Sequence, residues 1–206
     1  MSATGRERAA HTRARLLRAA AEVFDRDGFA RSSLTAVCAR ADVSKGALYC
    51  HFRSKEALGV AVIEEQSLLW HRLRDEQLAV EPSPFQALIS MSFEFADRLD
   101  TDLTVRVSAK LLREAVFFDV AAAAQVIGWV TVVRELLTLA REHGELRPEV
   151  NVRHAAEQVV AELLGLQFVA RALSGGTDLR TRLARLWRAS SGCLVTAPVR
   201  ARLRFE

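Results

Sequence analysis

The chain has 206 residues, half of them apolar, and its net charge of +4 is concentrated in residues 1–60, which hold eleven basic and six acidic side chains. This composition describes a soluble globular chain of one large or two small domains, whose basic N-terminal quarter suits a polyanionic partner or is a solvated face. No apolar run nears the ~20 residues of a membrane helix, and the N-terminal segment MSATGRERAAHTRARLL lacks the apolar core of a signal peptide. We therefore expect a cytoplasmic protein without membrane spans. The three cysteines are widely spaced, so we expect no metal site, and we expect no cofactor.

Apolar residues recur at helical spacing along the whole chain, which predicts an all-α protein of about nine helices. The first helix covers residues 12–27, with Thr12 as its N-cap and Gly28 as its stop. Ser33 caps a short second helix, and a turn at 42–44 separates it from another short helix that runs to about residue 51.

Longer helices follow these three. Ser54 caps a helix that connects the short helices to the rest and runs to about residue 79, and Ser83-Pro84 is typical of the start of the next. Further helices are predicted over 103–115, 119–143, 152–173 and 178–195, and the tail from Arg200 is expected to be loose.

The segment VSKGALYCHFRSKEAL, residues 43–58, admits three interpretations: a metal or nucleophile site on Cys50 and His51, the buried end of an ordinary helix, or a nucleic-acid surface. Neighbouring residues point about 100° apart on a helix, and no second Cys/His pair lies at a ligand spacing, which disfavours the first.

A helix-turn-helix needs small residues at the helix crossing and an apolar anchor in its second helix. Ala39 and Ala41 are the small residues, and Leu48 is the anchor. The second helix begins with Ser44-Lys45-Gly46-Ala47, and such short side chains permit close approach to a duplex. The pattern therefore favours a nucleic-acid surface.

At these residues the chain resembles the TetR family of transcriptional repressors. VSKGALYCHFRSKEAL is similar to that family's recognition helix and following turn, and LLRAAAEVFDRDGFARSSLTAVCARADVS to its first two helices. The resemblance implies a three-helix DNA-binding domain over residues 8–68, with the helix-turn-helix at about 31–50. It also implies DNA contacts at Ser33, Thr35, Ser44, Lys45, Gly46, Ala47, Tyr49, His51 and Lys55, with Phe52 buried.

One residue departs from the family's pattern. Asp42 occupies a turn position that the family usually fills with Gly. Asp tolerates the left-handed backbone better than most residues, so the motif is expected to remain intact.

The remaining residues, 69–206, are predicted to form a second, larger helical domain. Within it, residues 80–206 contain no acid–base pair at an obvious spacing, no nucleophile elbow and no phosphate loop, so the sequence does not predict an enzyme. From residue 64 on, the chain resembles the gamma-butyrolactone receptors of actinomycetes, a TetR subgroup. The resemblance lies in EEQSLLWHRL (64–73), ALISMSFEFADRLDTDLTVRVSAKLL (87–112) and IGWVTVVRELLTLAREHGEL (127–146). The resemblance implies an effector-binding and dimerisation domain in which Trp129 stacks on a lactone. The other effector contacts expected are Gln66, Trp70, Phe93, Val133 and Gln167, although each of these side chains also suits ordinary packing or a helix edge.

The last two long helices carry wide apolar stripes, and in the family the equivalent pair forms a four-helix bundle with a second copy. The expected dimer contacts are Val160, Leu164, Leu183 and Trp187. The resemblance thus implies a homodimeric repressor of a near-palindromic operator, released by a small apolar effector and controlling secondary metabolism such as antibiotic biosynthesis. Two alternatives stay open: the same fold answering an antibiotic, a fatty acid, a furan or nothing, and a helical enzyme or adaptor.

Overall fold

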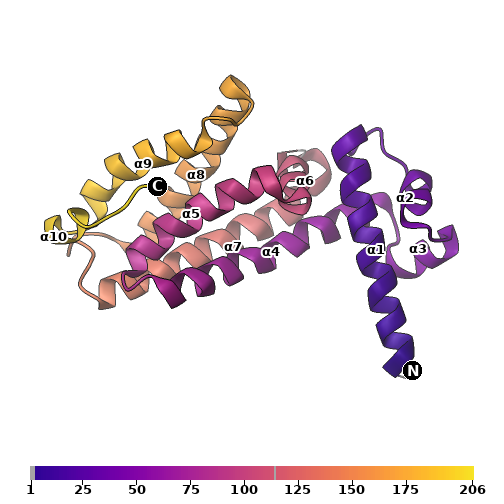
Figure 1. Cartoon of the computed structure of the whole chain (residues 1–206), viewed down its shortest axis with the longest axis horizontal. Coiled ribbons are helices and arrows are strands. Elements are labelled where there is room, and N and C mark those ends of the chain that lie inside the picture. The colour runs from indigo at the N-terminus through magenta and orange to yellow at the C-terminus, as the bar shows by residue number, and fades with distance from the viewer. Residues whose placement is uncertain (1–2, 114) are drawn as a thin grey trace. The chain divides into compact units, whose positions relative to one another are not determined.

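The computed structural model describes residues 3–113 and 115–206, and the side chains of residues 5–65, 69–113 and 120–206. Apart from one isolated bridge between Leu146 and Val195, the regular elements in these ranges are helices, which confirms the all-α prediction (Figure 1). They are α1 (Ala3–Asp27), α2 (Leu34–Ala41), α3 (Lys45–His51), α4 (Lys55–Val80), α5 (Pro84–Thr101), α6 (Leu103–Arg113), α7 (Ala115–Glu142), α8 (Val152–Ser174), α9 (Leu179–Leu194) and the single turn α10 (Ala197–Arg200).

The chain forms two compact units. The first unit comprises the described residues up to Leu68 together with Arg98–Gln125, and the second comprises Leu69–Asp97 and Val126–Glu206. The first unit thus holds α6 as well as α1 to α3, whereas the sequence assigned α6 to the larger domain. Helices α4, α5 and α7 each contribute residues to both units.

The first helix is longer than expected, since α1 begins at Ala3 rather than near residue 12. Thr12 is therefore not an N-cap; its hydroxyl donates a hydrogen bond of 2.9 Å to the Arg8 carbonyl one turn earlier. The predicted stop is confirmed, because Gly28 has a φ of +75° and donates its N–H to the Phe24 carbonyl. That left-handed conformation costs glycine little.

Short polar side chains begin most of the helices, as the sequence indicated. Ser33, Ser44, Ser54 and Ser83 each accept a hydrogen bond from the backbone N–H three residues later. Asn151 does the same for α8. These bonds satisfy backbone donors that an isolated helix end leaves unpaired, each typically stabilising by ~1 kcal/mol.

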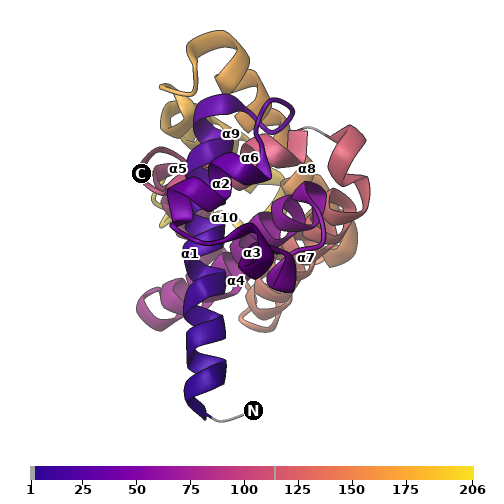
Figure 2. The same ribbon diagram turned by 90° about the vertical axis from the view of Figure 1, so that its right-hand side faces the viewer.

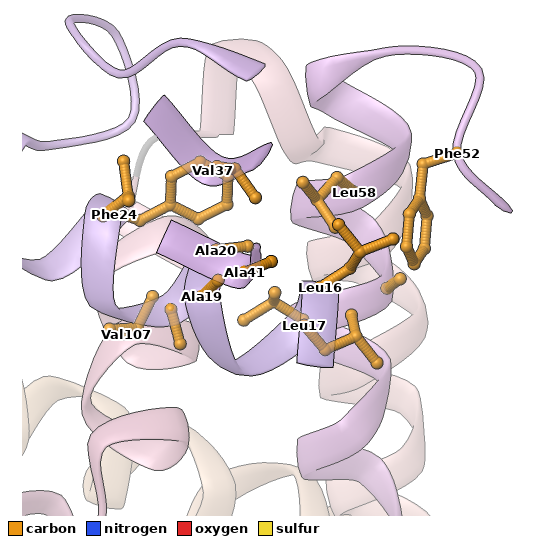
Figure 3. Close-up of a cluster of buried hydrophobic side chains, with 14 of the residues drawn as sticks. Leu16, Leu17, Ala19, Ala20, Phe24, Val37, Ala41, Phe52, Leu58 and Val107 are labelled. Atoms are coloured by element: carbon orange, nitrogen blue, oxygen red, sulfur yellow. The ribbon is translucent and has the colours of Figure 1, made fainter. Parts of the chain in front are cut away.

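The core of the first unit is built on one face of α1 (Figure 3). Leu16, Ala20 and Phe24 recur at helical spacing and are at most 2% exposed. They pack in one cluster with buried side chains of α2, α3, α4 and α6, among them Val37, Leu48, Leu58, Val62, Val107 and Leu111. Figures 1 and 2 both show α1 to α3 grouped together. Burial of α1 thus fixes the short helices, which are too short to be stable alone.

The second unit has its own core, in which Trp187 is one of the largest fully buried side chains. Its indole N–H donates to Ser92 Oγ at 2.8 Å, and its ring meets Phe85 edge-on with centroids 5.9 Å apart. Glu145 is 7% exposed and accepts a hydrogen bond of 2.9 Å from the Phe85 N–H near the start of α5. These contacts tie α5, the α7–α8 loop and α9 together.

Helix α7 is the most apolar of the described helices. By length and composition its residues Val120–Glu142 could cross a bilayer. An 18-residue stretch of this segment has a mean hydropathy of 1.5, and 33% of that stretch is buried within the protein. Unbroken apolar runs did not reveal this property, because it depends on the average over the helix. A core helix of a soluble protein can have the same composition.

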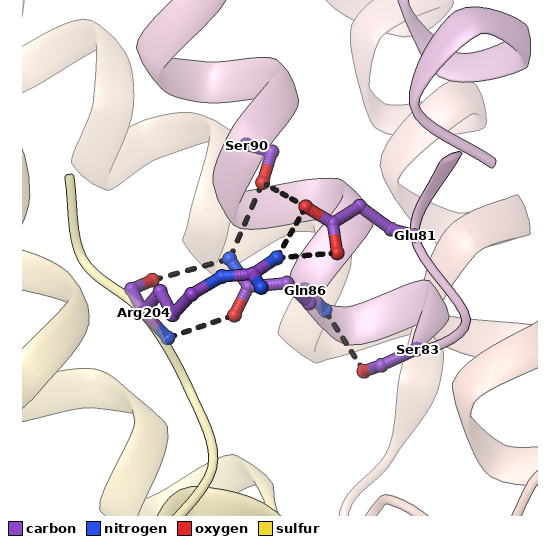
Figure 4. A network of polar contacts seen from close by, with 5 residues as sticks. All are labelled: Glu81, Ser83, Gln86, Ser90 and Arg204. Carbon is purple, nitrogen blue, oxygen red and sulfur yellow. Dashed lines mark hydrogen bonds and ion pairs between the residues drawn. The ribbon is translucent and has the colours of Figure 1, made fainter. Parts of the chain in front are cut away.

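The C-terminal tail is ordered against the second unit, so the expectation of a loose tail is wrong (Figure 4). The Gln86 amide donates to the Arg204 carbonyl at 3.1 Å and accepts from the Arg204 N–H at 2.9 Å. The Arg204 guanidinium bonds both carboxylate oxygens of Glu81 at 2.7 and 2.6 Å. Alternating basic residues suggested disorder because the sequence does not show these distant partners.

Gln86→Leu should release this tail. The change leaves the backbone groups of Arg204 without partners, so we expect the free energy of unfolding to fall by about 1–3 kcal/mol and carboxypeptidase to remove the tail faster. The same substitution at exposed Gln158 is the control and should change both quantities little. Equal digestion rates in the two variants would show that Gln86 does not hold the tail.

Candidate nucleic-acid interface and effector site

The exposed face of α3 carries most of the predicted DNA contacts. Ser44, Lys45 and Gly46 are exposed and Ala47 is half-buried, while Tyr49 is 55% exposed and Leu48 on the opposite face is fully buried. Leu48 thus anchors the helix in the core. The structure brings the small residues and the lysine together at the start of α3, where backbone N–H groups favour phosphate or base edges.

Space around Gly46 is open in the free protein. A methyl group added there would have only the Ser44 hydroxyl oxygen nearby, at 4.0 Å, and the φ of Gly46 is not in the left-handed region. Neither packing nor backbone conformation therefore requires glycine at this position. An exposed glycine here leaves the α3 backbone open to close approach by another molecule.

The turn between α2 and α3 is held in place by Arg15. Asp42 lies in the left-handed region with φ 52° and ψ 53°, which confirms the expected conformation at the position that departs from the family's glycine. The Arg15 guanidinium donates to the Ala41 and Asp42 carbonyls at 2.5 and 3.0 Å, and it lies 3.5 Å from the Asp42 carboxylate. That carboxylate is solvent-exposed, and Arg15 offsets its charge.

The other predicted contacts lie around α3. Ser33 and Thr35 are exposed at the start of α2, and His51 is half-buried at the end of α3, its ring 6.2 Å from that of Phe52. Phe52 itself is 4% exposed, as expected. Arg53 is exposed in the turn that follows α3 and was not among the predicted contacts. Its position directly after the predicted recognition helix could have suggested it.

Lys55 does not fit its predicted role. Its ammonium group donates to the carbonyls of Phe29, Ala30 and Ser32 at 2.7, 3.1 and 3.1 Å, and it lies 4.6 Å from the centre of the Phe29 ring. An ammonium group has three N–H donors, so all three are used within the chain. Lys55 therefore fixes the α1–α2 loop and leaves no donor for a phosphate.

An aromatic cluster in the second unit contains two of the predicted effector contacts. The ring of Trp70 lies 4.7 Å from that of Phe95 and 5.4 Å from that of Trp129 between centroids. The two tryptophans are 4% and 5% exposed. Phe95 was not predicted, because nothing in its spacing distinguishes it from the other phenylalanines. The three rings come from α4, α5 and α7, and each lies within four residues of the point where its helix leaves the first unit.

Both tryptophans of this cluster keep an unused polar group. Their indole N–H groups are buried and have no hydrogen-bond partner within the described part of the chain. A buried donor without a partner costs about 1–3 kcal/mol. The Trp187 indole, which does have a partner in Ser92, is the contrast.

The remaining predicted effector contacts are more scattered. Val133 is buried one turn after Trp129, whereas the Phe93 ring is covered by the Arg180 guanidinium at 5.1 Å. Gln167 is half-buried on α8, and the side chain of Gln66 lies outside the described residues.

Burial within one chain limits the predicted dimer contacts. Val160, Leu183 and Trp187 are 3%, 3% and 1% exposed, so their side chains already pack inside the chain and offer little surface to a partner. Leu164 is half-buried. Three large apolar side chains further along α8 are exposed instead: Phe168 at 65%, Val169 at 41% and Leu173 at 72%.

Comparison with known proteins places the chain in a family. Residues 16–62, from α1 into α4, match the family described as "Bacterial regulatory proteins, tetR family". The A-factor receptor protein of Streptomyces griseus is 36% identical over 181 residues, which are 88% of this chain and 63% of that protein. The chain belongs to the TetR family of transcriptional regulators.

Solved structures of TetR-type regulators share the fold. One, described as the molecular basis for control of antibiotic production by bacterial hormones, has a TM-score of 0.80 at 30% identity, covering 90% of this chain and 98% of its own. A gamma-butyrolactone receptor has a TM-score of 0.69 at 26% identity, covering 95% and 93%. CprB of Streptomyces coelicolor, in complex with its operator, has a TM-score of 0.70 at 29% identity, covering 95% and 94%.

These comparisons confirm the predicted family and the predicted all-α fold, and they show that the chain is a transcriptional regulator and not an enzyme. The matched part of the chain spans 63% of the length of the A-factor receptor protein. The individual DNA, effector and dimer contacts are therefore proposals for this chain.

Gly46→Ala separates folding from DNA binding in this TetR-type domain. Alanine favours helix, so we expect the free energy of unfolding to stay equal or rise by about 0.5–1 kcal/mol. The added methyl group should keep the duplex from the α3 backbone and weaken binding at least about tenfold. Gly128→Ala on α7, also in open space, is the control for helix propensity. Unchanged DNA affinity, measured by fluorescence anisotropy, would contradict close approach at Gly46.

Proposed function

We propose that the protein is a cytoplasmic, homodimeric repressor that binds a near-palindromic operator and releases it when a small apolar effector of the gamma-butyrolactone type binds. Its regulated genes would serve secondary metabolism, such as antibiotic production. The observation that carries the DNA-binding part is the α3 face, where exposed Ser44, Lys45 and Gly46 lie opposite the buried anchor Leu48. The related CprB has been solved on its operator, which supports the same use of this helix.

The proposed DNA contacts divide by chemistry. The hydroxyls of Ser33, Thr35, Ser44 and Tyr49 and the imidazole of His51 suit phosphate oxygens, and Arg53 joins them as an exposed cation. Gly46 and Ala47 contribute by being small, which lets base edges approach. Lys45 reaches a guanine or a phosphate from the first turn of the helix.

The aromatic cluster is the proposed effector site. Trp70 and Trp129 present two buried N–H donors on otherwise apolar surface. An uncharged ligand with acceptor oxygens and an apolar body would satisfy them, and a lactone with an alkyl chain has that chemistry. The A-factor receptor and the gamma-butyrolactone receptor are among the relatives, which supports this class. A furan whose substituents carry acceptor oxygens is the second candidate.

The C-terminal half of α8 is the proposed centre of the dimer. Phe168, Val169 and Leu173 are exposed on one chain, and a second copy would bury them in a two-fold arrangement. Dimerisation also suits the DNA, because each helix-turn-helix covers one half-site. The half-buried Leu164 stays in this proposal, while Val160, Leu183 and Trp187 support it from inside the chain.

The effector would act through helices that are continuous in the chain. Trp70 lies on α4, Phe95 on α5 and Trp129 on α7, and all three helices contribute residues to the first unit. A ligand that moves these rings therefore acts directly on helices that continue into the DNA-binding unit. It releases DNA only if it binds the DNA-incompetent state more tightly, since equal affinity for both states shifts nothing.

Lys45→Ala tests DNA binding. The duplex is selected by the wild-type protein from a random library, and its affinity is measured over a range of salt concentrations. Loss of one phosphate contact should weaken binding and reduce the slope of log affinity against log salt by about one unit. Arg72→Ala, an exposed cation of the second unit, should leave both unchanged. An unaltered slope and affinity for Lys45→Ala would rule out this contact.

Trp129→Phe tests the effector site. Phenylalanine keeps an apolar ring but lacks the N–H donor, so affinity for an alkyl-substituted gamma-butyrolactone should fall by about 0.5–1.5 kcal/mol, up to about tenfold, with DNA affinity unchanged. Trp70→Phe should act similarly. The control is Trp187→Phe, whose indole already bonds Ser92; it should lose stability and keep lactone affinity. Calorimetry that gives equal lactone affinities for Trp129→Phe and wild type would make Trp129 a packing residue only.

A further inference from the structure

Helix α6 is part of the same unit as the helix-turn-helix. Val107 and Leu111 are 0% and 1% exposed and belong to the cluster built on α1. Ser108, between them, is fully buried, and its hydroxyl donates to the Val62 carbonyl of α4 at 2.9 Å. Helix α6 is thus held both by apolar packing and by a specific hydrogen bond.

A half-buried ion cluster joins α6 to α1. The Asp25 carboxylate pairs with the Lys110 ammonium and, at 3.3 Å, with the Arg106 guanidinium. The three side chains are 26%, 30% and 33% exposed. Burial alone would raise the pKa of Asp25, but hydrogen bonds from Lys110 and Arg106 outweigh it and leave the pKa below its usual value. Asp25 is therefore ionised at neutral pH, and the cluster is charged.

Helix α1 uses neighbouring acids to contact two different helices. Glu22 forms an ion pair with Arg40 at the end of α2, and Asp25, three residues later, bonds α6. Helix α1 also carries Arg15, which fixes the turn leading into α3. The helix-turn-helix is thus attached along α1, and α1 is attached to α6 through Asp25.

We propose that Asp25 is a positioning residue for DNA binding: by holding α1 on α6, it sets the orientation in which α2 and α3 meet the duplex. The proposal rests on the proposed DNA-binding function. Asp25 acts through α1 and makes no contact with DNA.

Asp25→Asn tests this role, with Asp27→Asn as the matched control. Asp27 lies two residues further along α1 and its carboxylate pairs with Arg26 instead of α6. Loss of a negative charge from a DNA-binding unit should, by charge alone, strengthen binding to a polyanion in both variants. A positioning role predicts the opposite sign for Asp25→Asn only, a loss of about three- to tenfold in affinity, with the salt slope unchanged. The probe is a duplex that the wild-type protein enriches from a random library.

Hydrogen exchange provides a readout that does not involve DNA. Asp25→Asn should accelerate amide exchange in α2 and α6, and Asp27→Asn should not. Lys110→Met should reproduce the effect, and the double variant Asp25→Asn, Lys110→Met should add little to either. The proposal is overturned if Asp25→Asn binds the duplex as tightly as Asp27→Asn, or if its exchange matches that of the control. If the wild-type protein enriches no duplex, the DNA-binding function fails and exchange alone decides whether Asp25 links α1 to α6.

Discussion

The burial of one face of α1 is the interaction on which the first unit depends. Helices α2 and α3 have eight and seven residues, which is too few for stable isolated helices in water. They persist because Leu16, Ala20 and Phe24 give them a common apolar surface. Once these side chains are buried, the polar positions of α3 face outward, and a surface of small residues and one lysine results. The proposed DNA-binding face is thus the outer side of a packed core.

The same packing explains why α6 belongs with these helices although it is distant in sequence. Val107 and Leu111 contribute to the α1 cluster, and the ion cluster at Asp25 adds specificity to it. The second unit holds the aromatic cluster on the three helices that also enter the first unit. A regulator needs two sites that share a structural element with more than one arrangement. In the proposed function, the continuous helices that carry Trp70, Phe95 and Trp129 are these elements.

Local patterns in the sequence predicted most of the helices, the serine caps and the outward-facing residues of α3, whereas the start of α1 and the Thr12 cap were predicted wrongly. Ser33 and Ser44 each cap a helix by accepting a hydrogen bond from the N–H three residues later. The burial of Leu48 follows from its position on the apolar face of α3. The sequence-based predictions failed where a side chain has a partner far away in the sequence. The Lys55 ammonium group bonds the carbonyls of residues 29, 30 and 32, and the C-terminal tail is bonded to Gln86. Trp187 was assigned to the dimer because an apolar stripe does not reveal whether the same chain or a second copy covers it. Asp102 accepts a hydrogen bond from the Thr104 N–H at the start of α6. Aspartate is a typical N-cap residue, so this cap could have been predicted from the sequence.

The central claim is that an effector in the aromatic cluster changes the affinity of α3 for DNA. The direct measurement is the affinity of the wild-type protein for its selected duplex with and without a saturating alkyl-substituted gamma-butyrolactone. The account predicts at least a tenfold loss of affinity, which corresponds to about 1.4 kcal/mol of coupling between the two sites. A lactone that binds by calorimetry and leaves the duplex affinity unchanged would contradict it.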